Sequence, residues 1–73
     1  MNNFNIGDKV FLVSLDMRGL RYIATVIGPD TIIEKNDVAY ITATIRKWAT
    51  KEQVFATREQ AETYASKIEY QAN

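Results

Sequence analysis

The stretch that decides the fold runs from residue 9 to residue 35 and reads KVFLVSLDMRGLRYIATVIGPDTIIEK. It is rich in β-branched and aromatic residues, which favour strands. Its apolar segments predict three strands, at residues 9–14, 21–27 and 31–35. Residues 15–20 are expected to form a loop between the first two strands. Gly28-Pro29-Asp30 is expected to end the second strand, because proline and aspartate favour turns.

Beyond this stretch the strand pattern continues to about residue 56 and then gives way to a helical one. A longest strand is expected at roughly residues 38–48, and a further short strand at residues 53–56. Residues 57–71 are rich in Ala, Glu, Gln and Lys, which favour helix. Thr57 and Gln60 have the spacing of a capping box. The apolar residues recur at helical spacing, at Ala61, Tyr64, Ala65, Ile68 and Ala72.

These elements predict a mainly β (α+β) fold, namely a strongly bent antiparallel sheet or small barrel of four or five strands. A length of 73 residues predicts one domain, residues 1–73, with the β part at residues 5–56 and the helix at residues 57–71. Apolar residues occupy both faces of the first two strands. One face is therefore expected to fill the interior, and the C-terminal helix is expected to pack on the other.

Composition excludes most catalytic chemistry. The nine basic residues balance the nine acidic ones, and the chain has neither cysteine nor histidine. This rules out disulfides, zinc sites with Cys or His ligands and cysteine or Ser-His nucleophiles. The carboxylates lie mainly beside predicted turns, without the spacing of a metal site, and no glycine-rich phosphate loop is present. We therefore expect a protein that is not an enzyme, with no cofactor and no metal.

The apolar pattern also bears on where the protein acts. The longest unbroken apolar run is Val10–Val13, far shorter than a membrane helix needs. The N-terminal residues have neither the basic nor the apolar region of a secretion signal. We expect a cytoplasmic protein that does not bind a membrane.

Two motifs resemble known families. The segment FNIGDKVF, residues 4–11, resembles the opening strand of SH3-like small barrels of the KOW and Tudor type. The segment VFATREQAE, residues 54–62, resembles the strand-to-helix ending of many short phage and prophage proteins, with Gln60 where glutamate is usual. Val26-Ile27-Gly28 matches the second strand of the same proteins. The resemblance implies an SH3-like barrel followed by a helix and a phage-type origin, and it brings no catalytic residue.

The predicted strand at residues 38–48 offers a candidate recognition face. With a period of two, Ile41, Ala43 and Ile45 share the face expected to be core. The other face carries aromatics at both ends with hydroxyls and an arginine between them, at Tyr40, Thr42, Thr44, Arg46 and Trp48. Exposed Tyr, Trp and Arg dominate protein interfaces. In the alternative interpretation, the helix or the N-terminal segment covers Tyr40 and Trp48.

Basic residues form a second candidate site. They flank the first predicted loop and the end of the longest strand, at Arg18, Arg21, Arg46, Lys47 and Lys51. If these ends meet, the cations surround Trp48, and such a patch binds single-stranded nucleic acid through phosphate contacts and base stacking. In the alternative interpretation they are ordinary solvated charges, partly paired with acidic residues.

The sequence therefore favours a non-enzymatic protein-binding module. The resemblance implies a host or phage protein as partner, with this chain as adaptor or inhibitor in the cytoplasm of the bacterial host. The face expected to bind is centred on Tyr40, Arg46 and Trp48. Two alternatives remain open: a nucleic-acid-binding barrel that uses the basic residues, and a structural homo-oligomer with strand edges paired between subunits.

Overall fold

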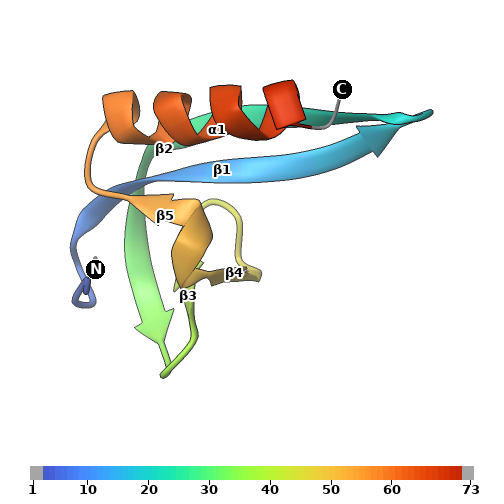
Figure 1. The fold of residues 1–73 in the computed structure, drawn as a ribbon. Coiled ribbons are helices and arrows are strands. Elements are labelled where there is room, and N and C mark those ends of the chain that lie inside the picture. Colours follow the sequence, from blue (N-terminus) through green and yellow to red (C-terminus); the bar gives the residue numbers. More distant parts are fainter. Residues whose placement is uncertain (1–2, 72–73) are drawn as a thin grey trace.

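A computed structural model describes the backbone of residues 3–71 and the side chains of residues 3–68. Five antiparallel strands form one sheet in the order β4-β3-β2-β1-β5, and one helix packs on it (Figure 1). The elements are β1 (Lys9–Arg18), β2 (Arg21–Lys35), β3 (Ala39–Thr42), β4 (Trp48–Thr50), the 3-10 turn η1 (Lys51–Gln53), β5 (Val54–Phe55) and α1 (Arg58–Gln71). The predicted mainly β fold with a C-terminal helix is confirmed.

The second and third predicted strands are one continuous strand, so the prediction of a turn at Gly28-Pro29-Asp30 is wrong. In the β1–β2 pairing, Val10 lies opposite Asp30 and Leu12 lies opposite Ile27. Two residues of β2 therefore face one residue of β1, which is a β-bulge that bends the strand without ending it. The backbone at Gly28 has φ 147°, and the Gly28–Pro29 peptide bond is cis. The bent strand pairs with β1 along its first part and with β3 at its end.

The predicted loop at residues 15–20 is also wrong, because β1 continues through most of it. Paired residues run to Arg18, opposite Arg21, and only Gly19 and Leu20 form the connection. Gly19 has φ 65°, a conformation that suits a two-residue hairpin loop. β5 pairs with β1 only at Phe11 and Leu12. The hairpin beyond them, residues 14–25, projects past the other strands and is called the arm below (Figure 1).

The predicted strand at residues 38–48 is divided into β3 and β4 by a turn. The Thr44 N–H donates to Asp30 Oδ1 over 3.1 Å, and the Arg46 N–H donates to the Thr42 carbonyl over 2.9 Å. Arg46 has φ 58°, which ends the extended conformation. The assignment of faces is therefore wrong as well, because Tyr40 and Thr42 are fully buried while Ala43 is exposed.

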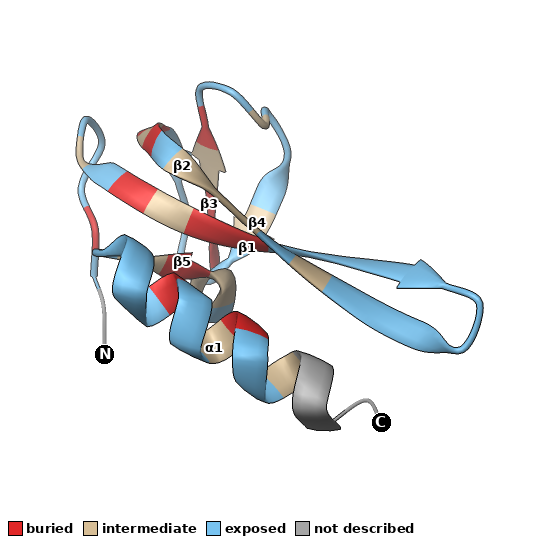
Figure 2. Cartoon of the chain, turned by 90° about the horizontal axis from the view of Figure 1, so that it is seen from above, coloured by how far each residue is buried: buried red, intermediate tan, exposed pale blue. Residues whose placement is uncertain are grey.

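Two apolar clusters lie on opposite sides of β1 and β2. Inside the bent sheet are Phe4, Val10, Leu12, Ile32, Tyr40 and Val54. Between the sheet and α1 are Val13, Ala61 and Ala65, with Phe11, Ala24, Val26, Phe55 and Tyr64 around them. The expectation that the helix covers the second face is confirmed (Figure 2). Ala72, the last residue of the predicted stripe, lies outside the described residues.

The predicted start of the helix is confirmed within one residue. The Gln60 N–H donates to Thr57 Oγ1 over 3.1 Å, so Thr57 caps α1. Arg58, the first helical residue, donates from Nη2 to the Gly28 carbonyl over 2.8 Å and lies over the Phe11 ring. These contacts hold the N-terminus of α1 against the bulge of β2.

Tyr40 is a core residue, which corrects its assignment to a binding face. Its side chain is 1% exposed, and its hydroxyl accepts a hydrogen bond from the Phe4 N–H over 3.1 Å. The Phe4 and Tyr40 rings meet edge to face with centroids 5.8 Å apart. The N-terminal segment therefore covers Tyr40, as the alternative interpretation held. Trp48 is 52% exposed, so that interpretation is wrong for Trp48.

We expect Tyr40→Phe to lower the free energy of unfolding by about 1–2 kcal/mol, because the buried Phe4 N–H loses its acceptor. Urea unfolding measures the change. Tyr22→Phe is the matched control, since Tyr22 is 46% exposed, and we expect it to change stability by less than about 0.5 kcal/mol. Equal effects of the two substitutions would contradict the buried hydrogen bond.

Candidate protein-binding site: the arm and the cleft beneath it

The arginines predicted to bind, Arg18 and Arg21, lie at the tip of the arm. They face each other across the two-residue connection, and Leu20 between them is 93% exposed. Arg18 Nε lies 3.7 Å from Asp16 Oδ2, and both side chains are largely exposed. Such an ion pair contributes little to stability. The tip therefore presents an apolar side chain between two arginines.

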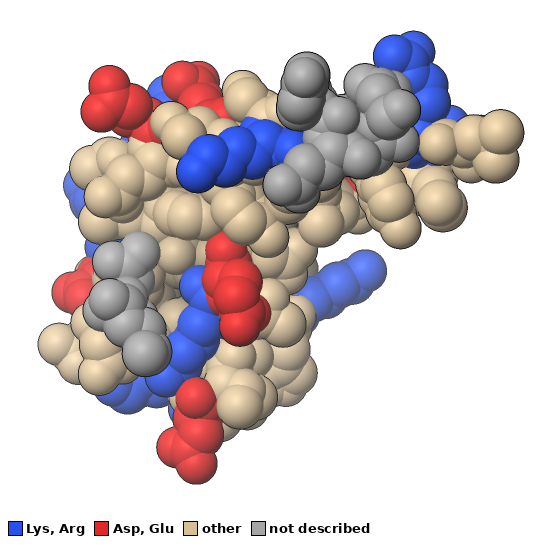
Figure 3. Space-filling model, in the orientation of Figure 1, with Lys and Arg blue, Asp and Glu red and all other residues tan. Residues whose placement is uncertain are grey.

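The other predicted cations lie near β4. Arg46 is in the turn before β4 and donates from Nε to the Ala43 carbonyl over 3.2 Å. Lys47 follows it and is exposed. Lys51 is in η1, with its Nζ 5.8 Å from the centroid of the Tyr40 ring. The arm tip is separated from β4 in both ribbon views (Figures 1 and 2). The structure thus does not bring the five basic residues together, and Figure 3 shows basic side chains in several separate places on one face.

Exposed apolar side chains are concentrated on the arm. Of the nine large hydrophobic residues that are exposed among the described residues, five are Leu15, Met17, Leu20, Tyr22 and Ile23. The arm makes up a small part of the chain, so this concentration is not the usual scatter of single surface apolar residues. Exposed apolar residues on a projecting hairpin are typical of an interaction surface.

The arm has a helix side and an underside. Residues directly opposite in an antiparallel pair share a face. Val13 lies opposite Val26, and both belong to the cluster beneath α1. Two steps along the same face, Met17 lies opposite Tyr22, so both are on the helix side. The underside carries the alternate residues, Ser14, Asp16, Ile23 and Thr25.

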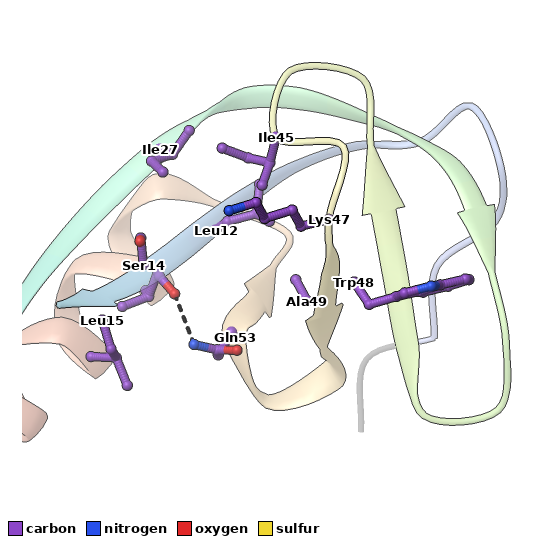
Figure 4. Close-up of a pocket in the computed structure, with 10 residues that line it drawn as sticks. Leu12, Ser14, Leu15, Ile27, Ile45, Lys47, Trp48, Ala49 and Gln53 are labelled. Atoms are coloured by element: carbon purple, nitrogen blue, oxygen red, sulfur yellow. Dashed lines mark hydrogen bonds between the residues drawn. The ribbon is translucent and has the colours of Figure 1, made fainter.

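A cleft of about 200 Å³ lies beneath the arm. Its apolar lining includes Leu12, Ile27, Ile45 and Ala49, and its other lining residues are Val13, Ser14, Leu15, Lys47, Trp48 and Gln53. In Figure 3 the arm overhangs the lower part of the molecule, with a notch between them. In Figure 4 Lys47 extends across the cleft, while the Trp48 ring points away from Ser14 and Leu15. Lys47 and Trp48 are thus the predicted site residues that belong to this cleft.

The outer edge of β1 is open along the arm. Two side chains bind backbone groups on this edge: Gln53 Nε2 donates to the Val13 carbonyl over 3.2 Å, and the Met17 N–H donates to Asp16 Oδ1 over 3.0 Å. Odd-numbered residues of β1 therefore direct their backbone groups away from β2. Leu15, between them, does so too, and β5 reaches no farther than Leu12. An open edge next to a cleft is an arrangement that accepts an additional strand.

The pKa of Asp30 is lowered, and its role is structural. Burial raises its pKa, but hydrogen bonds from the N–H groups of Thr31 and Thr44 outweigh burial and hold the pKa below its ordinary value. Asp30 Oδ2 and Thr42 Oγ1 are buried without a hydrogen bond of good geometry, although the Thr42 hydroxyl is near enough to contribute to the lowered pKa. Asp30 in β2 and Thr42 at the end of β3 lie beside the turn that leads to β4, and neither lines the cleft.

The described residues contain no group of three or more acidic side chains that is arranged to hold a metal ion. They also include no helix long and apolar enough to cross a membrane.

The arm was missed because a loop was predicted at residues 15–20. A usable signal was present, since Phe11, Val13, Leu15 and Met17 continue one apolar alternation through the predicted loop. The cleft had no such signal, because it depends on where the turn before β4 meets β1.

Comparison of the chain with protein-family models, with curated proteins and with solved structures finds no match.

Proposed function

We propose that this chain is a non-enzymatic protein-binding module that docks on its partner through the arm and the cleft beneath it. The observation that carries the proposal is the concentration of exposed apolar residues on a projecting hairpin. Burying large apolar side chains is the main driving force of protein association. Trp48 and Lys47, at the margin of the cleft, extend this surface.

The partner proposed is a host or phage protein, with the chain acting as adaptor or inhibitor in the bacterial cytoplasm. This part of the proposal rests on the sequence resemblance to short phage and prophage proteins. A docked arm would occlude a partner surface with a projecting hairpin whose other end is fixed in the sheet.

We infer further that the bent sheet is an SH3-like small barrel. Two features support this. β2 pairs with β1 at one end and with β3 at the other, so it runs through both halves of the sheet. The edge strands β4 and β5 are joined directly by η1, and the apolar cluster around Tyr40 lies between the two halves.

Site-specific photo-crosslinking tests the function. A benzophenone amino acid at Met17 is compared with the same group at Val38, which is 68% exposed but lies off the arm. Each protein is irradiated in a bacterial lysate after nuclease treatment, and adducts are identified by mass spectrometry. We expect a discrete protein adduct from position 17 that excess unmodified chain removes by competition, and no such adduct from position 38.

The other outcomes count against the proposal. Adducts from position 17 that disappear with nuclease would favour nucleic-acid-associated binding through the arm-tip arginines. An adduct that consists only of two copies of this chain would favour the homo-oligomer. The same adducts from both positions would show that the arm has no special role.

A further inference from the structure

We propose that the partner contributes an extended segment that adds as a strand to the outer edge of β1, with a large apolar side chain in the cleft and a carboxylate against Lys47. This inference rests on the proposed function and specifies how the partner is recognised. It assigns binding to three features: the outward N–H and carbonyl of Leu15, the apolar lining of the cleft, and the Lys47 ammonium.

The backbone of β1 supplies the first feature. Leu15 directs its N–H and carbonyl away from β2, because its neighbours on the same edge, Val13 and Met17, bond outward to side chains. β5 pairs with β1 up to Leu12, and the Gln53 side chain ends that pairing at Val13. An added strand would therefore continue the line of β5 along the arm. Main-chain hydrogen bonds of this kind give affinity without depending on sequence.

The cleft supplies selectivity. Alternate side chains of an added strand point to opposite faces of the sheet. Those on the underside point toward the cleft, whose floor includes Leu12, Ile27 and Ile45. A volume of about 200 Å³ is smaller than a typical small-molecule site and suits a single large apolar side chain. A partner segment therefore needs one such residue on its underside.

Lys47 supplies the charge preference. It extends across the cleft (Figure 4), and it forms no salt bridge with any side chain of residues 3–68. The carboxylate of Asp16 is occupied by the Met17 N–H and lies near Arg18. A carboxylate two residues from the apolar anchor would point to the same side of the added strand and could pair with the Lys47 ammonium.

In one register, a second copy of the chain fits this edge poorly. If two arms paired antiparallel so that Leu15 and Met17 of each exchanged hydrogen bonds, Asp16 of one copy would lie directly opposite Asp16 of the other. Like charges directly opposite destabilise a strand pair. The Lys47 ammonium beside the cleft, unpaired among the described residues, favours a different chain, whose segment carries a carboxylate as its partner.

Selection from a displayed library of randomised linear dodecapeptides tests the inference. We expect enrichment of peptides with a large apolar residue and an acidic residue two positions away. The most enriched peptide is then synthesised, and its binding to the wild type and to Leu15→Pro is measured. Leu15→Pro removes the outward N–H but none of the β1–β2 hydrogen bonds. Leu15→Thr is the matched control because it shortens the same side chain and keeps the N–H.

We expect Leu15→Pro to weaken binding about tenfold or more, because at least one main-chain hydrogen bond is lost, and Leu15→Thr by less than about threefold. Lys47→Glu should weaken binding about tenfold as well, whereas Lys9→Glu, with the same change of net charge at another exposed lysine, should leave it unchanged. Unfolding curves and amide spectra of each variant verify the fold.

Three results would overturn the inference: no enriched peptide, peptides without the acidic residue, or binding that Leu15→Pro leaves intact. They are distinguishable from failure of the proposed function. A specific cross-linked adduct from position 17 together with any of these results would leave protein binding standing and reject strand addition. Absence of both the adduct and the peptides would reject both.

Discussion

Replacing Asp30 with alanine is expected to lower the free energy of unfolding by about 3 kcal/mol. Asp30 Oδ1 accepts hydrogen bonds from the Thr31 N–H over 2.8 Å and the Thr44 N–H over 3.1 Å, and its side chain is 5% exposed. Hydrogen bonds to a charged group contribute more than neutral ones, and their loss here leaves two N–H donors without an acceptor. A domain of this length has a free energy of unfolding of roughly 4–11 kcal/mol, so the substitution removes about a quarter to three quarters of it.

The matched control is Asp37→Ala, which removes the same charge from an exposed turn residue. We expect it to change stability by less than about 0.5 kcal/mol. Urea unfolding at pH 7 measures both variants. Similar losses in the two variants would contradict the role of Asp30 in the turn between β3 and β4.

The contribution of Asp30 also depends on pH. Its pKa in the folded protein is lowered, because the hydrogen bonds to the carboxylate outweigh burial. A carboxyl of this kind adds stability above its unfolded pKa, and that stability is lost as the pH falls through the folded pKa. The difference between wild type and Asp30→Ala should therefore be full at pH 7 and shrink below about pH 4. A difference that stays constant down to pH 2 would contradict the lowered pKa.

Replacing Gly28 with alanine is expected to cost about 4 kcal/mol and to leave much of the chain unfolded. An added Cβ would lie 2.6 Å from Phe11 Cδ2 and 3.0 Å from the Val10 carbonyl oxygen. The φ of 147° is also one that L residues rarely adopt. The clash falls at the bulge where β2 bends, next to the carbonyl that binds Arg58.

Gly7→Ala separates these two causes. Gly7 has φ 98°, but an added Cβ there meets nothing within 4 Å. We expect a loss of about 1–2 kcal/mol from the backbone conformation alone. Thermal unfolding followed by circular dichroism compares the variants. If Gly28→Ala were no worse than Gly7→Ala, the close approach of β2 to Phe11 would be wrong.

Local signals predicted the helix and its packing. The apolar stripe containing Ala61 and Ala65 can be predicted from helical periodicity alone. The Thr57 cap can be predicted from residues within one helical turn. The unbroken apolar run from Val10 to Val13 likewise indicated a strand with two apolar faces, and the interior cluster and the helix cover these faces. These features could be predicted because their causes lie within a few residues along the chain.

The bends and turns of the sheet could not be predicted in this way. Gly28-Pro29 has the composition of a turn, yet pairing with β1 on both sides keeps it within a strand. The turn before β4 depends on Asp30, whose side chain accepts a hydrogen bond from the Thr44 N–H, 14 residues farther along the chain. The sequence pattern does not show that contact and predicts a single strand at residues 38–48. The alternation of faces along this predicted strand then placed Tyr40 and Thr42 on the wrong face.

The candidate site was predicted in part. Lys47 and Trp48 border the cleft, whereas Arg18 and Arg21 lie at the arm tip and Lys51 beside Tyr40. Residue type alone identified Lys47 and Trp48, near β4, as candidate binding residues, but not the backbone edge at Leu15. Whether a strand edge is open depends on the order of the strands in the sheet and on where each neighbouring strand ends. The pattern of a single sequence does not contain this information.

Amide hydrogen exchange at Leu15 tests strand addition most directly. The rate is measured by NMR for the free protein and at saturation with the selected peptide. We predict that the Leu15 N–H exchanges at least tenfold more slowly when the peptide is bound, because the added strand accepts its hydrogen bond. The amides of Ser14 and Asp16, which already face β2, should change far less. An unchanged Leu15 rate at saturation would contradict strand addition at this edge.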